Sequence, residues 1–315
     1  MNRSLLSRRD ILAGMGVLAG SALLADVPAV AASAAKVDAP KARSRTADIT
    51  FGYASISWAG KDQQAIDDIA ALGFKGIQLR SNIMPEWGDK PAALRDLLKA
   101  RGLTFVALSS GNIAIDPAKE AEDQAAHFRN AKFVKDAGGL YLQVTDARPK
   151  REVTAADFKR LADVMTELGK RTADIGIPLS YHNHMNSLGE APQEVDAIMD
   201  AVDPRYVKLE LDVAHYQQGG GDPVKAIDTY AQRILFLHLK DVASPFTPPG
   251  AESRPYEFVE LGRGKVDLPN VFAALDRAGY KGWAIIELDR VYGRTPKEAA
   301  AISKQFVEKT LKRKV

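Results

Sequence analysis

Residues Leu209 to Gly220 read LELDVAHYQQGG, a short apolar strand that ends on Asp212, with His215 three residues further on. A carboxylate at the end of a hydrophobic strand is held rigidly, while the glycines beyond it leave the loop open. A metal or substrate site of an α/β protein needs this arrangement. An isolated Asp after a strand is, however, more often a helix cap or a turn residue. The meaning of Asp212 therefore depends on how the other strands end.

The chain around this stretch alternates between strand and helix patterns. Eight short apolar runs predict strands, at 49–55, 76–80, 104–109, 140–145, 178–183, 207–212, 234–238 and 283–288. Eight segments predict helices, at 61–72, 91–100, 118–137, 154–174, 191–201, 223–231, 268–278 and 296–311. Glycines predict left-handed caps at five helix ends, namely Gly73, Gly102, Gly138, Gly176 and Gly279.

Eight strand–helix units with short connections predict an α/β fold, a single closed (β/α)8 TIM barrel over residues 48–315. The alternative is a doubly wound open sheet. It is disfavoured because no glycine-rich phosphate motif follows the first strand.

The N-terminus has the features of a cleavable export signal. Ser7-Arg8-Arg9-Asp10-Ile11-Leu12 precedes an apolar run that ends at Leu24, and Ala29-Val30-Ala31 offers small residues for cleavage. Residues 1–31 therefore resemble a twin-arginine signal, which predicts export of the folded protein to the periplasm by the twin-arginine translocation machinery. A plain secretory signal or a membrane anchor is the alternative, although the run is short for a span of about 20 residues. Residues 32–47 predict a short flexible leader.

Composition limits the chemistry. The 315 residues are 46% hydrophobic and 26% charged, as in an ordinary globular protein. The 43 Lys and Arg nearly balance the 40 Asp and Glu, giving a net charge of +3, so no nucleic-acid partner is expected. The sequence has no cysteine. Any metal must therefore be bound by His, Asp, Glu or water.

Catalytic groups of a TIM barrel lie at the carboxyl ends of its strands. Four of the five histidines fall there, and only His127 lies elsewhere, in a predicted helix. Imidazole and carboxylate ligands suit Mn, Co, Mg or Zn, so we predict one divalent metal ion. The polar residues at the predicted strand ends are Arg80, Ser109, Asp146, His182 with His184, Asp212 with His215, His238 with Lys240, and Glu287 with Asp289.

Five motifs in these strands and loops resemble those of the sugar isomerase/epimerase superfamily, which has a xylose-isomerase-like barrel. Within that superfamily the pattern is most similar to inosose-dehydratase-type and keto-sugar-acting members, and the resemblance covers residues 48–315. The motifs are YHNHM (181–185), LDVAH (211–215), FLHLKD (236–241), ELGRGKVD (260–267) and IIELD (285–289).

The resemblance implies that Asp212, His238 and Glu287 bind the metal and that His215 contacts the substrate. His182 stands where many members have a glutamate that is both ligand and catalytic carboxylate. We predict His182 as the fourth ligand. His184 is the alternative, because it follows on the same face of the strand.

The resemblance also implies an enzyme that removes a proton next to the carbonyl of a sugar or keto-sugar through a metal-stabilised enediolate. Glu287 or an imidazole would take the proton. Reprotonation gives an isomerase or an epimerase, and loss of a β oxygen gives a dehydratase or lyase acting on a 3-keto-glycoside or an inosose. Because His182 replaces the glutamate, isomerisation or β-elimination is favoured over epimerisation, with Lys240, His184 or Glu190 as the second acid.

Two other classes of protein are compatible with the predicted fold. A non-catalytic periplasmic sugar-binding barrel would keep the same fold. A metal-dependent endonuclease acting on abasic DNA also shares it, but near-neutral charge and export argue against one. Trp58 and Trp87 could stack on a sugar ring or pack in their loops, and Arg263 lies in a long connection, 241–267, predicted to form part of the substrate site. The predicted partner is a small carbohydrate, and the protein could form a homo-oligomer.

Overall fold

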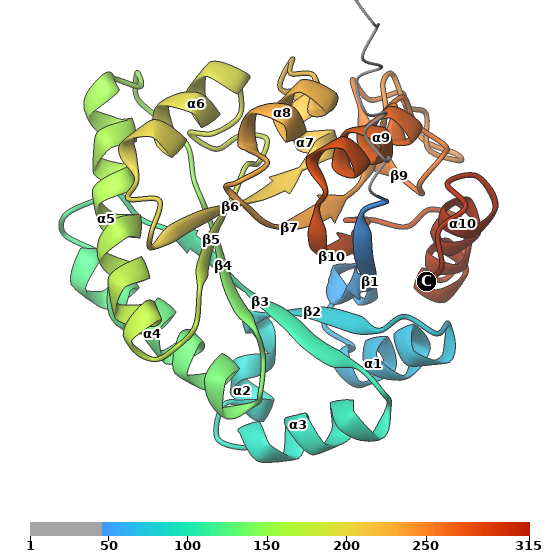
Figure 1. Ribbon diagram of the computed structural model, residues 1–315, viewed down its shortest axis with the longest axis horizontal. Coiled ribbons are helices and arrows are strands. Elements are labelled where there is room, and N and C mark those ends of the chain that lie inside the picture. Colours follow the sequence, from blue (N-terminus) through green and yellow to red (C-terminus); the bar gives the residue numbers. More distant parts are fainter. Residues whose placement is uncertain (1–45) are drawn as a thin grey trace, which may run out of the picture. The chain divides into compact units, whose positions relative to one another are not determined.

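The computed structural model describes residues 46–315; the predicted signal and residues 32–45 of the predicted leader lie outside the described residues. Eight parallel strands close into a barrel in the order β1-β10-β7-β6-β5-β4-β3-β2, which confirms the predicted fold (Figure 1). The barrel strands are β1 (Asp48–Ala54), β2 (Gly76–Arg80), β3 (Thr104–Ile113), β4 (Tyr141–Asp146), β5 (Leu179–His182), β6 (Val207–Asp212), β7 (Ile234–Leu239) and β10 (Lys281–Ile286).

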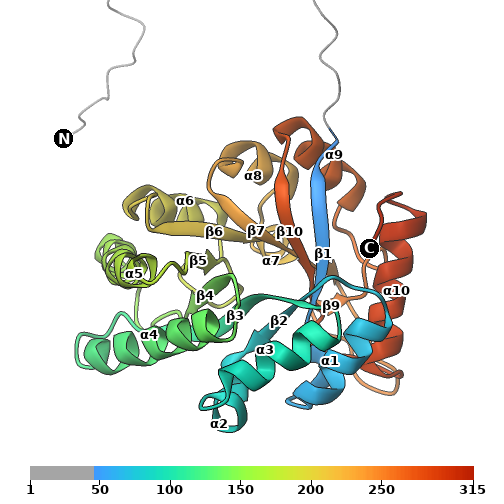
Figure 2. The same cartoon turned by 60° about the horizontal axis from the view of Figure 1, so that its bottom comes forward.

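Helices surround the strands on the outside, as Figures 1 and 2 show. The five glycines predicted to cap helix ends all have positive φ, between 62° and 86°, which confirms that prediction. Within residues 46–315, none of the helices is long and apolar enough to cross a membrane. The main helices are α1 (Asp62–Ala71), α3 (Pro91–Ala100), α4 (Glu120–Asp136), α5 (Ala155–Asp174), α6 (Pro192–Ala201), α8 (Pro223–Tyr230), α9 (Leu268–Ala278) and α10 (Pro296–Lys309).

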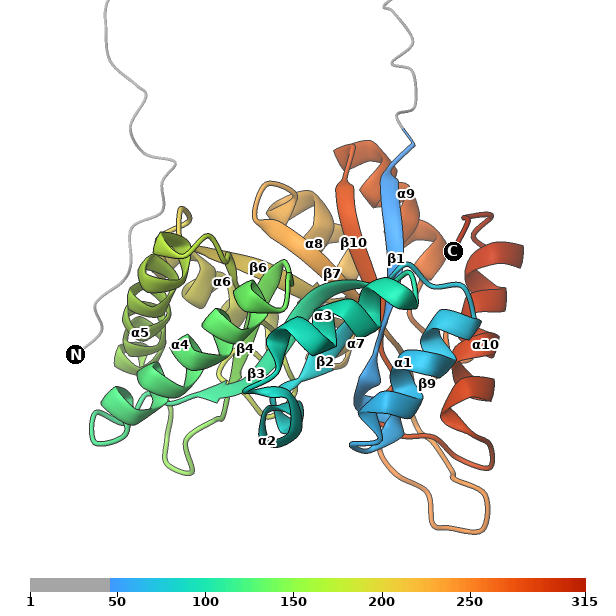
Figure 3. The same cartoon turned by 90° about the horizontal axis from the view of Figure 1, so that it is seen from below.

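Several short elements lie in the loops and are absent from the sequence prediction. They are η1 (Ser55–Trp58), η2 (Ser81–Ile83), α2 (Met84–Trp87), α7 (Val213–Gln218) and an antiparallel pair of strands, β8 (Asp241–Ala243) with β9 (Glu257–Val259). In Figure 3 the loop between β8 and β9 extends beyond the ends of β1 and β10 at the bottom of the view.

The buried carboxylate of Asp241 holds the chain that returns from β9. It accepts hydrogen bonds from the backbone N–H groups of Gly262, Gly264 and Val266, at 2.9 to 3.0 Å. A Cβ at position 264 would collide with this carboxylate, so the close approach requires glycine. The long connection predicted from the sequence is therefore an ordered structure beside the mouth of the barrel.

The barrel interior changes from apolar to polar along the strands. Tyr141 on β4 and Phe236 on β7 stack with ring centroids 5.4 Å apart. Because side chains two residues apart share a face of a strand, the next inward positions are Gln143 and His238. Both are buried. The carboxyl ends of the strands thus place polar groups inside the barrel at the end where a TIM barrel carries its site.

Candidate active site

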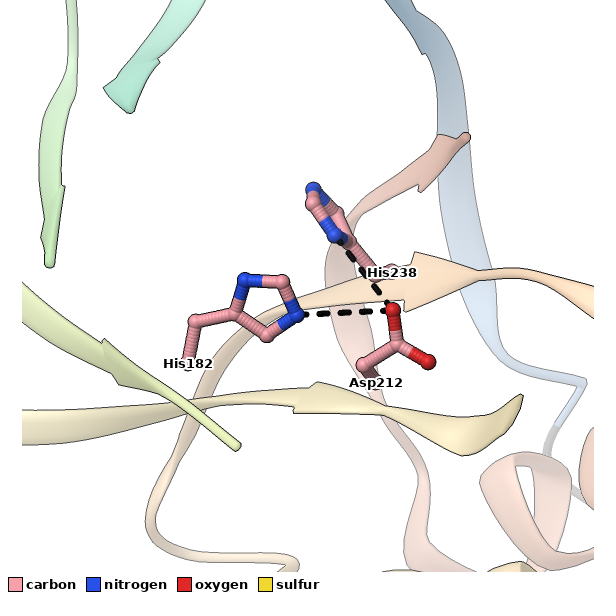
Figure 4. Close-up of side chains that lie close together, drawn as sticks. All are labelled: His182, Asp212 and His238. Carbon is pink, nitrogen blue, oxygen red and sulfur yellow. Dashed lines mark ion pairs between the residues drawn. The ribbon is translucent and has the colours of Figure 1, made fainter. Parts of the chain in front are cut away.

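Three ligand-type side chains from three neighbouring strands converge at this end of the barrel. His182 ends β5 and Asp212 ends β6, where Asp212 is in register with His238 of β7. The Oδ2 atom of Asp212 lies 3.4 Å from His182 Nε2 and 3.6 Å from His238 Nδ1. Figure 4 shows both rings pointing toward this oxygen. The three ligand atoms lie within 4.8 Å of one another, a spacing that one metal ion could bridge.

The backbone fixes the carboxylate of Asp212. Its Oδ1 atom accepts hydrogen bonds from the N–H groups of Ala214 and His215, at 2.9 and 2.8 Å, and so caps the N-terminus of α7. The side chain of Asn183 binds both the N–H and the carbonyl of Asp212, at 2.9 and 3.1 Å. One oxygen therefore caps a helix, as the alternative interpretation expected, and the other faces the site.

The three converging atoms are buried and have no hydrogen-bond partner among residues 46–315: His182 Nε2, Asp212 Oδ2 and His238 Nδ1. Leaving buried polar atoms unpaired is costly, and in native proteins such atoms usually have a partner or a bound ion. A divalent ion would satisfy all three atoms at once. Two imidazoles and a carboxylate are also a donor set that suits Zn, Mn or Co.

His238 is held from behind through its other nitrogen. Its Nε2 atom lies 2.7 Å from Gln78 Oε1 on β2 and 2.6 Å from Glu210 Oε1 on β6. Burial lowers the pKa of His238, but the carboxylates of Glu210 and Glu287 outweigh burial and raise it well above its usual range. Oxygen partners on the far nitrogen orient a ligand histidine toward a metal. Neither Gln78 nor Glu210 was predicted from the sequence.

Glu287, which follows β10, completes the cluster together with a buried lysine. Its Oε2 atom lies 3.2 Å from His238 Nδ1 and 2.6 Å from the ammonium of Lys240. Burial alone would raise the pKa of Glu287, but His238 and Lys240 lower it well below its usual range. Glu287 is therefore an ionised carboxylate, available as a ligand or as an acceptor.

Lys240 is fully buried and has three carboxylates around it. Besides Glu287, its Nζ atom lies 3.0 Å from Asp289 Oδ1 and 3.5 Å from Asp212 Oδ2. Burial lowers the pKa of Lys240, but these carboxylates raise it well above its usual range, so the group is charged. Glu210, which contacts His238, adds a fourth carboxylate to the cluster. Four carboxylates thus surround Lys240 and His238, and a bound cation would reduce the remaining negative charge.

A cavity of about 380 Å³ opens onto the cluster from the mouth of the barrel. His182, His184, Glu287 and Asp289 lie on its wall, and Lys240, which does not line it, lies behind them. The remaining lining residues come from β2, β3 and β4 and from the loops after β1, β4 and β5: Ile56, Arg80, Ser109, Gly111, Asn112, Gln143, Thr145, Asp146, Ala147, Met185 and Asn186.

His184 is a lining residue of this wall with one ring nitrogen in a hydrogen bond to the backbone. Its Nδ1 atom lies 2.6 Å from the carbonyl oxygen of Met185. Because a carbonyl can only accept, Nδ1 carries the ring proton, and Nε2 of the neutral ring can accept one. Burial, together with the neighbouring His182 and Lys240, lowers the pKa of His184. The ring is therefore neutral at pH 7.

The other predicted site residues do not line this cavity. His215 is buried between the rings of His184 and Phe258, at 3.9 and 4.4 Å. The indole N–H of Trp58 donates to Asp68 at 3.0 Å.

Three further candidates lie in the loops. Trp87 packs against the core, and Glu190 accepts from the N–H of Asn186 at 2.6 Å, within its own loop. Arg263 lines a separate cavity of about 320 Å³ beside β9. The roles predicted for these residues and for His215 and Trp58 remain predictions.

This chain is similar to known proteins in sequence and to solved structures in fold. A family model described as xylose isomerase-like TIM barrel matches residues 66–310. The chain is 27% identical over 296 residues to an inosose dehydratase of Lacticaseibacillus casei, with 84% of this chain and 97% of that protein covered. It is 26% identical over 295 residues to the inosose dehydratase of Geobacillus thermodenitrificans (strain NG80-2), with 83% and 97% covered. A crystal structure of the IOLI protein with a zinc atom matches with a TM-score of 0.68 at 18% identity, covering 82% and 96%.

Proposed function

This chain belongs to the xylose isomerase-like TIM barrel family, and on that premise we propose that it is a metal-dependent lyase that removes water from a keto-sugar of the inosose type. The observation that carries the proposal is the identity of the groups on the cavity wall. β5 ends in the imidazole of His182, and His184 is a neutral base beside it. Epimerisation by two opposed carboxylates needs one on each face of the substrate carbon, whereas elimination can use a single base on one face.

The metal in this proposal would be held by His182, Asp212, His238 and Glu287. When bound, a divalent ion withdraws electron density from a substrate oxygen and so makes the neighbouring C–H more acidic. The unpaired buried atoms of the first three residues support this assignment, and the ionised carboxylate of Glu287 lies within 3.2 Å of His238 Nδ1.

We assign the proton transfer to His184. Its Nε2 atom accepts the proton from the carbon next to the ketone and then donates it to the hydroxyl that leaves from the β carbon. A C–H bond and a C–O bond break, a C=C bond and an O–H bond form, and the product is water plus an unsaturated ketone. No oxidant is needed. Lys240 keeps Glu287 ionised and holds the carboxylates of Glu287 and Asp289 in place during the reaction.

Replacement of His184 tests this assignment. We expect His184→Gln to lower kcat for dehydration of an inosose by at least about 100-fold, the lower range for loss of a general base. Because His184 is not in the ligand set, metal content should stay at the wild-type level, whereas His182→Gln should lose metal. The measurements are the absorbance of the unsaturated ketone and metal analysis of both variants.

If the wild-type protein exchanges the substrate proton with D2O but forms no unsaturated ketone, the dehydratase proposal is wrong and the enzyme is an isomerase or epimerase. Wild-type activity of His184→Gln would contradict the assignment of His184 and make Glu287 the group that takes the proton. Inactivity of the metal-loaded wild type on all keto-sugars would favour the non-catalytic sugar-binding barrel.

One observation favours a second candidate, the cleavage of a keto-glycoside. The site cavity shares Asn112 and Ala147 with a groove of about 760 Å³ between the loops after β3 and β4. A substituent on the sugar would have room there, and the same β-elimination would then release an alcohol in place of water. The assay above separates the two candidates when free and glycosidic keto-sugars are compared.

We also propose that the protein is exported to the periplasm by the twin-arginine machinery. The support is the sequence Ser7-Arg8-Arg9-Asp10-Ile11-Leu12 and the apolar run after it. Recovery of the protein only from the cytoplasmic fraction of its host would contradict this.

A further inference from the structure

We infer that Gln143 is a substrate-binding residue that recognises a hydroxyl group on the part of the ring opposite the reacting carbon; this inference rests on the proposed function. Gln143 lies in the middle of β4, and only 1% of its surface is exposed. It lines the site cavity. Neither its Nε2 nor its Oε1 atom has a hydrogen-bond partner within residues 46–315.

Folding alone does not favour an amide at this position. Tyr141, Gln143 and Thr145 alternate with outward residues and share the inner face of β4. Tyr141 continues the apolar interior through its stacking on Phe236. An apolar side chain at position 143 would extend this layer, whereas an amide with both ends unpaired carries a desolvation penalty. The amide therefore points to a ligand.

The position of β4 in the barrel tells which part of a ligand Gln143 would contact. In the ring of eight strands, β4 and β10 are separated by three strands on either side, so they face each other across the barrel. Gln143 from β4 and Glu287 after β10 line the same cavity. A ring bound near the cluster of His182, Asp212 and His238 therefore has its far side toward Gln143.

An amide restricts the chemistry of this contact. Oε1 only accepts and Nε2 only donates, so the pair is satisfied by hydroxyl groups, which do both. Two hydroxyl-bearing residues, Ser109 and Thr145, line the same cavity. The matching ligand is a polyhydroxylated ring, and an analogue that lacks the far hydroxyl would leave the amide unpaired. Gln143 thus contributes to substrate specificity, while the cluster across the cavity carries the reaction.

Gln143→Met tests the inference, because methionine has a similar length and removes both polar atoms. We expect kcat/KM for an inosose to fall about 10- to 100-fold, mainly through a higher KM, with unchanged metal content. Discrimination against the analogue that lacks the far hydroxyl should disappear. The melting temperature of the free protein should stay the same or rise, because an unpaired buried amide has been removed.

Gln124→Met is the matched control. Gln124 is also buried, but its Nε2 donates to the carbonyl of Val164 at 2.8 Å and it does not line the cavity. This variant should melt at a lower temperature and keep the wild-type KM. If Gln143→Met is destabilised like Gln124→Met and keeps the substrate preference, the amide is a structural residue satisfied by water, and the inference is wrong.

A binding assay keeps the inference testable if the wild type proves inactive on keto-sugars, a result that would count against the proposed function alone. myo-Inositol, which has a hydroxyl on every ring carbon, is then the probe. Thermal stabilisation of the wild type by myo-inositol, with a smaller effect on Gln143→Met, supports the inference. Equal effects of myo-inositol on both proteins contradict it.

Discussion

Asp212→Asn is expected to lose metal binding almost completely and to lower kcat/KM by more than about 100-fold, the upper range for residues that only support a ligand. The substitution keeps the size of the side chain. The new amide oxygen can still accept from the N–H groups of Ala214 and His215, so α7 keeps its cap. The other position changes from a carboxylate oxygen to an NH2 group that faces His182 Nε2 and His238 Nδ1. An NH2 group cannot bind a cation.

Asp222→Asn is the control for this result. Asp222 caps α8 in the same way, with Oδ1 accepting from the N–H groups of Val224 and Lys225 at 3.0 and 3.3 Å. It lies outside the site cavity. Metal titration by calorimetry should therefore give wild-type affinity for Asp222→Asn. Wild-type affinity for Asp212→Asn would show that the metal binds elsewhere.

Lys240→Met is expected to destabilise the metal-free protein by about 3–5 kcal/mol, as when one partner of a buried ion pair is removed. The side chain of Lys240 is fully buried, and its ammonium lies between Glu287, Asp289 and Asp212. Without it these carboxylates repel one another in a region of low dielectric. A divalent ion restores a positive charge beside them. The melting temperature of Lys240→Met should therefore rise more on addition of Mn²⁺ than that of the wild type.

Lys225→Met provides the comparison. Lys225 lies 3.4 Å from Asp222 with its side chain 84% exposed, and such a surface pair contributes about 0–1 kcal/mol. Thermal melts with chelator and with Mn²⁺ measure both effects. Two outcomes would contradict the electrostatic account of the cluster: a metal-free Lys240→Met that melts like Lys225→Met, or an equal shift with Mn²⁺ in every variant.

The barrel could be predicted from the sequence because its signals are local. Each strand is a short apolar run, apolar residues recur at helical spacing in the helices, and glycines end five of them. The convergence of His182, Asp212 and His238 was also predictable. Parallel strands bring their carboxyl ends to the same edge of a sheet, so polar residues at the ends of consecutive strands meet.

The residues that orient the ligand side chains, such as Gln78 and Glu210, make contacts between distant parts of the chain, which a local sequence pattern does not show. Gln78 reaches His238 across 160 residues of sequence, and this contact exists only after the barrel closes. A polar residue at an inward position of an apolar strand was the available signal, in GIQLR for Gln78, in KLELD for Glu210 and in YLQVTD for Gln143.

For residues in the loops, the sequence predicted a functional role and a structural role without deciding between them. Tryptophan is a residue type that often stacks on sugars. The hydrogen bond from the Trp58 indole to Asp68, however, depends on the packing of η1 beside α1, which the sequence pattern does not show. α7 has six residues, too few for a helical period to stand out. The sequence could not decide whether Asp212 is a helix cap or a metal ligand. In the structure one carboxylate oxygen caps α7 and the other faces His182 and His238.

Anomalous diffraction from crystals grown with Mn²⁺ tests the central claim most directly. The account predicts a single strong anomalous peak in contact with His182 Nε2, Asp212 Oδ2 and His238 Nδ1, with the carboxylate of Glu287 beside it. A fully loaded crystal whose peak lies away from these atoms would contradict the account, as would a cluster in which Lys240 alone neutralises the carboxylates and no peak is present.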